Sequence, residues 1–325
     1  MAKIFSKSKL KDFLNFLGQK YHILAPVKKE KHFLFEIINP FSDIPQIEKT
    51  ILNYPTTIIP PTKFFFKTAD PIWAISQKKI ERIFETKPVL LFGVHLYDAK
   101  AFDILDKVLK KDPVWRQRRK KSLIIAVRHQ PRVFHFEETF LEEGIPNSVD
   151  IFLEKTGEHW IAFAISEKGK VELAQAPGKT VDWQLRIKPK TDSVFPWSFS
   201  ALEKIITLDN PGWDDLVKRC IMCGICSYVC PVCYCFDIKD KVDLATKKVT
   251  RERHWTSCML QDFAQTGNKV KSPKERIFNW YYHKFVRFPK EFGTLGCVGC
   301  GRCIKFCPAK IDFRKEIEKL AKPKK

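Results

Sequence analysis

"CIMCGICSYVCP" (Cys220–Pro231) and "CVGCGRCIKFCP" (Cys297–Pro308) repeat one pattern, in which spacers of two, two and three residues separate four cysteines and a proline follows. The two copies hold eight of the eleven cysteines, and every cysteine of the chain lies at or after position 220. The first residues, "MAKIFSKSKLKDF", lack the apolar segment of a signal peptide. Many cysteines without an export signal favour metal or redox chemistry over a disulfide framework.

The cysteine spacing is that of two-cluster ferredoxins, in which each [4Fe-4S] cluster takes four thiolates. One C-x2-C-x2-C loop supplies three of them, and the small residues Gly224, Gly299 and Gly301 suit a loop pressed against a cluster. The fourth cysteine has been carried away from that cluster and ligates the other one. We therefore predict two [4Fe-4S] clusters with exchanged fourth ligands. The first set is Cys220, Cys223, Cys226 and Cys307, and the second is Cys297, Cys300, Cys303 and Cys230.

Structural zinc is the alternative to iron and sulfide. A zinc site uses two C-x2-C pairs, so a third cysteine at the same spacing and a fourth before proline serve no tetrahedral site. Three cysteines stand outside the repeat, namely Cys233, Cys235 and Cys258. They are either buried thiols without a metal or, with His254 as a fourth ligand, part of a further centre. The sequence leaves this choice open.

Length and charge set the remaining limits. With 325 residues and 44% apolar content, the chain predicts two globular domains. The net charge of +21 is shared between +10 in residues 1–205 and +11 in residues 206–325, so no basic arm for nucleic acid is evident. The excess favours a basic face that docks acidic partner subunits. No run of eighteen apolar residues occurs, and we expect no membrane span and a cytoplasmic location.

Residues 1–205 predict an α/β (or α+β) domain. A buried strand "PVLLFGV", a helix with Asp98 as its N-cap and a second buried strand "SLIIAV" form a βαβ unit with parallel strands. Further along, "HWIAFAISEKGKVELAQ" predicts a hairpin that turns at Lys168. No Gly-rich dinucleotide or phosphate motif follows a strand. His95 and Tyr97 lie at the carboxyl end of a strand, where α/β sheets bind ligands, and are either functional or packed there.

Residues 206–325 predict a mainly α-helical dicluster ferredoxin domain. A helix that starts at Asn210 leads into the first motif, and a second helix starts at Ser272 within "SPKERIFNWYYHKFVRF". The 66 residues between the motifs exceed the short β-rich connection of small bacterial ferredoxins. A connection of this length is similar to that of the α-helical ferredoxin modules in respiratory and hydrogenase complexes.

Several segments resemble one known family. "CPVCYCFD", "WTSCM", "YHKFVRFPKEFG" and "GCVGCGRCIKFCPAKID" closely resemble the iron–sulfur β subunit of cytoplasmic [NiFe] hydrogenases of the sulfhydrogenase type. They equally resemble the corresponding iron–sulfur subunit of anaerobic sulfite reductase, which belongs to the same dicluster family. The segments "PPTKFFF", "KPVLLFGVHLYDAKAFDILDKVL" and "DPVWRQRRKKSLIIAV" follow the order of that family's N-terminal domain. Some relatives carry cysteines in the places of Tyr97 and "RHQPRVFHF", so a metal centre in the N-terminal domain is not expected here.

The resemblance implies an electron-transfer subunit. It would connect a flavoprotein subunit that oxidises NAD(P)H to the catalytic subunits of a hydrogenase or of a sulfite reductase, and we prefer the hydrogenase. The sequence shows no nucleophile, triad or general base of its own. One alternative is an enzyme whose N-terminal domain binds a flavin or a small sulfur substrate. Another is a nucleic-acid-processing protein with a structural cluster, which the even charge distribution disfavours.

Overall fold

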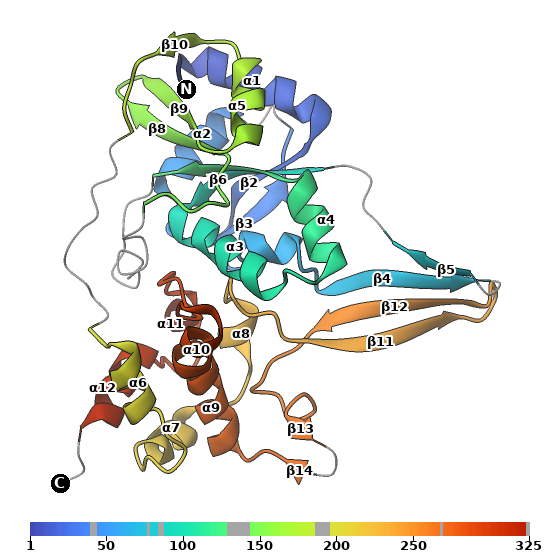
Figure 1. Ribbon diagram of the computed structural model, residues 1–325, viewed down its shortest axis with the longest axis vertical. Helices are drawn as coiled ribbons and strands as arrows, with labels where there is room; N and C mark the ends of the chain where they lie inside the picture. The colour runs from blue at the N-terminus through green and yellow to red at the C-terminus, as the bar shows by residue number, and fades with distance from the viewer. Residues whose placement is uncertain are drawn as a thin grey trace.

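The computed structural model describes residues 1–39, 44–76, 79–83, 88–128, 144–185, 196–266 and 269–322. Three parts are evident in Figure 1: a layered α/β part, a group of helices that holds both cysteine motifs, and a four-stranded arm that projects to one side. In these described ranges, every helix is too short or too polar to cross a bilayer.

The α/β part is built on an eight-stranded sheet in the order β10-β1-β9-β8-β7-β6-β2-β3. Its strands β8, β7, β6 and β2 are parallel, whereas the other neighbours pair antiparallel. Because β6 reaches its parallel neighbour β7 through α3, the predicted βαβ unit is confirmed. The strands are β1 (Ala2–Phe5), β2 (His22–Lys29), β3 (His32–Ile37), β6 (Val89–His95), β7 (Leu123–Val127), β8 (Ile151–Thr156), β9 (His159–Ala164) and β10 (Lys179–Val181).

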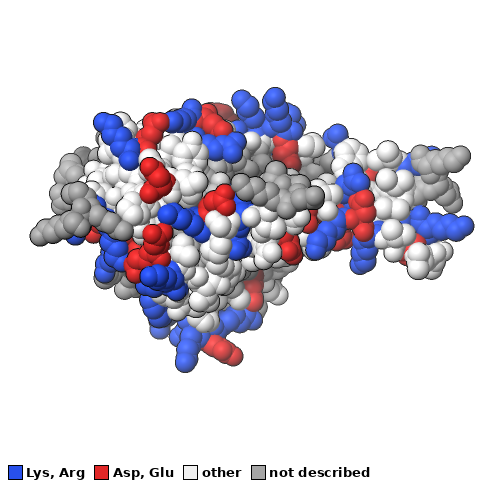
Figure 2. All heavy atoms as spheres, turned by 90° about the horizontal axis from the view of Figure 1, so that it is seen from below, with Lys and Arg blue, Asp and Glu red and all other residues white. Residues whose placement is uncertain are grey.

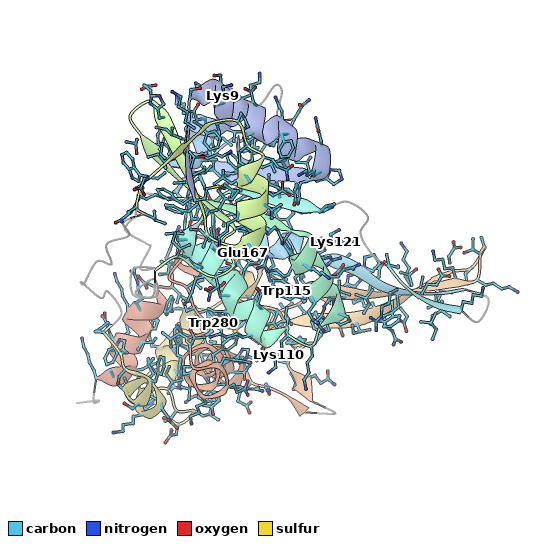
Figure 3. All side chains as sticks on the ribbon, turned by 45° about the horizontal axis from the view of Figure 1, so that its top comes forward. Lys9, Lys110, Trp115, Lys121, Glu167 and Trp280 are labelled. Atoms are coloured by element: carbon cyan, nitrogen blue, oxygen red, sulfur yellow. The ribbon has the colours of Figure 1, made fainter. Side chains whose placement is uncertain are left out.

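Helices cover both faces of this sheet because side chains alternate along its strands. Leu90 of β6 faces a core with α1, α2 and α5, whereas its neighbour Leu91 faces a core with α3 and α4. In the second core, the ring of Trp115 lies 6.0 Å from that of Phe102 (Figure 3). The helices are α1 (Lys7–Lys20), α2 (Ile44–Asn53), α3 (Leu96–Val108), α4 (Pro113–Lys121) and α5 (Glu167–Ala174), with a 3-10 turn η1 (Pro61–Phe64).

The predicted hairpin at Lys168 is wrong, because β9 is followed by helix α5. The Ser166 hydroxyl caps this helix by accepting a hydrogen bond of 3.0 Å from the Gly169 amide. Gly169 lies so close to the sheet that an added Cβ would stand 1.9 Å from the Asp150 carbonyl oxygen. The glycine that indicated a turn is thus required by the packing of a helix against the sheet.

The arm is a sheet in the order β11-β12-β4-β5 with antiparallel neighbours, and each half of the chain supplies two strands. At its base, the buried Asp70 carboxylate accepts hydrogen bonds from Arg118 and Arg253. The strands are β4 (Ala69–Ser76), β5 (Lys79–Arg82), β11 (Phe236–Asp243) and β12 (Lys248–Trp255). The prediction of a mainly helical C-terminal domain is therefore only partly right. The connection between the motifs contains β11, β12 and a short hairpin of β13 (Gln265–Thr266) and β14 (Lys269–Val270).

The C-terminal helices pack around one apolar core that includes Trp213, Trp280 and Phe285. Helix α9 begins as predicted, with Ser272 and Glu275 forming a capping box. The division of the chain at residue 205 stays a prediction. The helices are α6 (Phe199–Ile205), α7 (Trp213–Arg219), α8 (Ile225–Tyr228), α9 (Pro273–Tyr282), the π-helical turn η3 (His283–Arg287), α10 (Phe288–Phe292), α11 (Arg302–Lys305) and α12 (Phe313–Ala321).

A buried ion pair joins α11 to the start of α3. The Arg302 guanidinium donates two hydrogen bonds to the Asp98 carboxylate, at 2.6 Å and 2.7 Å, and both side chains are 0% exposed. A third hydrogen bond of 2.8 Å runs from Arg302 Nε to the carbonyl oxygen of Thr57. The prediction of Asp98 as an N-cap is wrong: the N-cap is His95, and the Asp98 carboxylate binds Arg302 instead.

We expect Asp98→Ala to destabilise the protein strongly, because it leaves the Arg302 charge buried without a partner. Breaking a buried pair in this way costs about 3–5 kcal/mol. The measurement is the thermal melting temperature of the cluster-loaded protein. The control is Asp215→Ala, which removes an exposed carboxylate from a surface pair with Arg219 and should leave the melting temperature unchanged. Equal melting of the two variants would contradict the importance of the Arg302–Asp98 pair.

Candidate metal centre

Both cysteine motifs adopt the same backbone conformation. In the first, Met222 and Gly224 have left-handed φ angles of 57° and 77°; in the second, Gly299 and Gly301 at the equivalent positions have φ angles of 67° and 65°. A non-glycine residue such as Met222 is rare in this region and costs about 1 kcal/mol there. Each loop then enters a short helix, α8 or α11, and the fourth cysteine follows that helix. The repeat in sequence is therefore a repeat in structure.

The first motif surrounds a cavity together with the last cysteine of the second motif. Apolar side chains, among them Ile277, Trp280 and Phe313, form the rest of its wall. Cys223 is exposed, and Ile221 beside it is 63% exposed, so this cavity lies near the protein surface. The predicted ligands around it are Cys220, Cys223, Cys226 and Cys307, and Cys303 also reaches it.

A second cavity lies behind the second motif and is lined by the last cysteine of the first. Trp280, Phe313 and Cys303 line both cavities, so the two are neighbours across a shared wall; Figure 3 shows Trp280 among the C-terminal helices. Lys284 is the charged residue on the second wall. The predicted ligands here are Cys230, Cys297, Cys300 and Cys303.

Burial makes the thiolate form of these cysteines costly without a compensating charge. Removal from water raises the pKa of Cys226 and Cys300 to about 12, and that of Cys297 to about 11. Thiolates in such surroundings are stabilised by a bound metal centre, which binds the deprotonated form. Four converging thiols in each apolar cavity thus fit a thiolate-held cluster better than they fit free thiols.

Backbone amides supply the hydrogen bonds that thiolate clusters use. The amides of Met222 and Gly299, each two residues after the first cysteine of its motif, bond to the sulfur atoms of Cys220 and Cys297. The Ile311 amide lies 3.4 Å from Cys307 Sγ. The left-handed turns that point these amides inward are the same in both motifs, so the loops and the donor set agree with each other.

Lys284 is the site residue that the sequence did not identify. Its Nζ donates a hydrogen bond of 3.2 Å to Cys230 Sγ, and its side chain is 5% exposed. Burial by itself lowers the pKa of Lys284, but the sulfur atoms of Cys230, Cys233 and Cys297 outweigh this effect and hold the pKa well above its ordinary value. The signal available in the sequence was a lysine on the apolar stripe of α9 and η3, beside Trp280 and Tyr281.

The three remaining cysteines lie beside the motifs. Cys235 shares a hydrogen bond with Cys258, and Cys233 shares one with Cys230. His254 bonds instead to Glu252, with 3.0 Å between Nε2 and Oε2, so it does not join them. Within the described ranges, no three His, Cys, Asp or Glu side chains are grouped to hold a single metal ion. A [4Fe-4S] cluster differs from a single ion, because each thiolate binds a separate iron.

His95 and Tyr97 are both fully buried, and the contacts they make are packing contacts. The Nδ1 atom of His95 lies 2.7 Å from the Tyr97 hydroxyl, and the His95 ring stacks on Tyr54 at 3.8 Å. Tyr97 belongs to a small apolar cluster with Val298 and Cys300, which joins the α/β part to the second motif. The strand end where a ligand was considered is thus filled by side chains.

These features define an iron–sulfur protein of the ferredoxin type. A family model described as "4Fe-4S dicluster domain" matches residues 219–311, a segment that includes both motifs. The chain is 28% identical over 325 residues to the sulfhydrogenase 2 subunit beta of Pyrococcus furiosus, with 95% of each chain covered. The resemblance to the iron–sulfur β subunits of sulfhydrogenases is therefore confirmed.

More distant similarity is confined to part of the chain. Over 120 residues, 37% of this chain, it is 27% and 29% identical to the pyruvate-flavodoxin oxidoreductases of Klebsiella pneumoniae and Trichormus variabilis, of which it covers 8%. No solved structure matches the chain. The segment shared with the oxidoreductases is about the length of the C-terminal part, so it adds no information on the α/β part.

We expect Cys307→Ala to damage the site of the first motif and to spare that of the second. The reason is that Cys307 lines the first cavity although it belongs to the second motif. Iron analysis should give a loss of about half, and the EPR spectrum of the reduced protein should match that of Cys223→Ala. A spectrum that matches Cys300→Ala instead would show that each motif keeps its own fourth cysteine.

The matched control is Cys233→Ala, which removes a neighbouring thiol outside both predicted sets. Iron content should then stay at the level of the unsubstituted protein. A loss of about a third of the iron would contradict this expectation and would indicate a third cluster that includes Cys233.

Proposed function

We propose that this chain is an electron-transfer subunit that moves electrons through two [4Fe-4S] clusters. The observation that carries the proposal is the crossed lining of the two cavities, where each motif meets the last cysteine of the other. The ligand sets would be Cys220, Cys223, Cys226 and Cys307 for one cluster, and Cys297, Cys300, Cys303 and Cys230 for the other. The shared wall of Trp280, Cys303 and Phe313 supports transfer between them in a single step.

In this proposal, electrons pass between a flavoprotein subunit that oxidises NAD(P)H and the catalytic subunits of a [NiFe] hydrogenase or sulfur reductase. The full-length similarity to a sulfhydrogenase β subunit favours this complex over an anaerobic sulfite reductase. A cytoplasmic location would follow from such partners. The subunit would have no substrate of its own, and its chemistry would be the gain and loss of single electrons by each cluster.

The flavin-binding alternative finds little support in the α/β part. The carboxyl ends of β6 and β7 are where such sheets bind ligands. There, His95, Tyr97 and Asp98 are all 0% exposed and hold one another, Tyr54 and Arg302. The α/β part therefore acts, in this proposal, as a support for the second motif.

Two surface features support a place in a larger assembly. On the arm, Val242, Val249, Ile75 and Ile80 form one cross-strand row, and Ile80 and Val242 are 65% and 55% exposed. Apolar side chains gathered in this way are typical of surfaces that contact other proteins. On the face shown in Figure 2, lysine and arginine are interspersed with acidic residues, which agrees with protein partners better than with nucleic acid.

We expect the isolated, anaerobically prepared chain to show iron–sulfur absorption without the structured bands of a flavin. NADH or NADPH alone should leave its clusters oxidised, and addition of the proposed flavoprotein partner should allow their reduction. The measurement is the bleaching of cluster absorption under both conditions. Bound flavin in the isolated chain, or direct reduction by NAD(P)H, would support the oxidoreductase alternative; zinc in place of iron would refute both.

A further inference from the structure

Lys284 stands in a relation to the second cavity that has no counterpart in the repeat. Its Nζ lies 3.2 Å from the sulfur of Cys230 and 3.0 Å from the carbonyl oxygen of Gly296. Cys230 is the thiol that the first motif contributes to this cavity, and Gly296 directly precedes Cys297. One ammonium group therefore contacts both chain segments that meet at the second site.

The backbone holds this lysine in place. The Gly296 amide donates a hydrogen bond of 2.8 Å to the Lys284 carbonyl oxygen, so the two residues are bonded to each other twice. A Cβ on Gly296 would stand 3.0 Å from Lys284 Cα and from the Phe288 ring, which explains the glycine there. Lys284 also lies in the π-helical turn η3, and such turns in an α-helix often occur at functional sites.

The two cavities differ in what surrounds them. Around the first, Cys223 is exposed to solvent, and the nearby Arg219 is already paired with Asp215 and Glu316. Around the second, Arg302 beside Cys300 is neutralised by Asp98. Lys63 donates its hydrogen bond to the Cys233 carbonyl oxygen. Lys284 is thus the cation that donates directly to a predicted ligand sulfur there.

A cluster gains negative charge when it is reduced, so both water and a nearby cation stabilise the reduced form. The second cavity has little water, and burial alone makes a cluster there harder to reduce. A buried ammonium counteracts this effect strongly, because charges interact more strongly away from water. The contact with Cys230 adds a hydrogen bond to sulfur, which acts in the same direction.

We propose that Lys284 raises the reduction potential of the cluster bound by Cys230, Cys297, Cys300 and Cys303, and thereby lets this buried cluster accept electrons from the more exposed one. The proposal rests on the proposed function, because it requires both clusters. Within that function it makes Lys284 a positioning residue for electron flow, which acts through its fixed charge. The repeat itself provides no such asymmetry, since both motifs have the same spacing.

The test is a redox titration of the full, cluster-loaded chain followed by EPR, at fixed pH. Two neutral variants, Lys284→Met and Lys284→Gln, should each lower the electron-binding constant of the buried cluster at least tenfold, which is about 59 mV for a one-electron couple. The exposed cluster should shift less, and comparison with Cys223→Ala assigns the two signals. The charge-retaining Lys284→Arg should restore most of the potential.

The matched control is Lys290→Met, which removes the same charge from an exposed pair with Glu203 on the neighbouring helix α10 and should shift neither potential. Equal shifts in Lys290→Met and Lys284→Met, or an unchanged buried cluster in both neutral variants, would overturn the proposal. So would loss of iron in both neutral variants with retention in Lys284→Arg, because Lys284 would then be needed to hold the ligand. Failure of the proposed function differs, since the unsubstituted chain itself would then lack two iron–sulfur signals.

Discussion

A single ion pair without access to water, between Arg302 and Asp98, determines how the two halves of this protein meet. Arg302 stands between Cys300 and Cys303 in the sequence, and Asp98 stands at the start of the helix that follows the central strand β6. Neither charge is tolerable in the interior alone, so each requires the other half of the protein to be folded and in place. The second cysteine loop therefore takes its position from the α/β sheet.

The first cysteine loop is attached to the same sheet by different contacts. Directly after that motif, the carbonyl oxygens of Pro231 and Cys233 accept hydrogen bonds from Thr62 and Lys63 of η1. The two motifs are thus fixed to one support through separate bonds, and their cavities share a wall. A fixed distance between two redox centres is what an electron carrier requires, and here the fold provides it without contributing to the chemistry.

Local features of this protein could be predicted from its sequence, and long-range ones could not. The cysteine spacing, the left-handed glycines of the loops, the buried strand β6 and the capping box at Ser272 each depend on a few neighbouring residues. Asp98 has the position and chemistry of an N-cap, and only Arg302, about two hundred residues later, changes its role. Gly169 gives a turn signal in the sequence, although its conformation serves helix packing.

The arm shows why the connection between the motifs is long. Much of it forms β11 and β12, which are rich in charge and carry few signals of a buried strand; they form because β4, from the other half, offers its edge. At the base of the arm, Arg253 of β12 and Arg118 of α4 share the Asp70 carboxylate. This attachment and the Arg302–Asp98 pair lie at different places along the junction. Two separated buried ion pairs resist rotation of one half against the other, whereas one pair alone would act as a pivot.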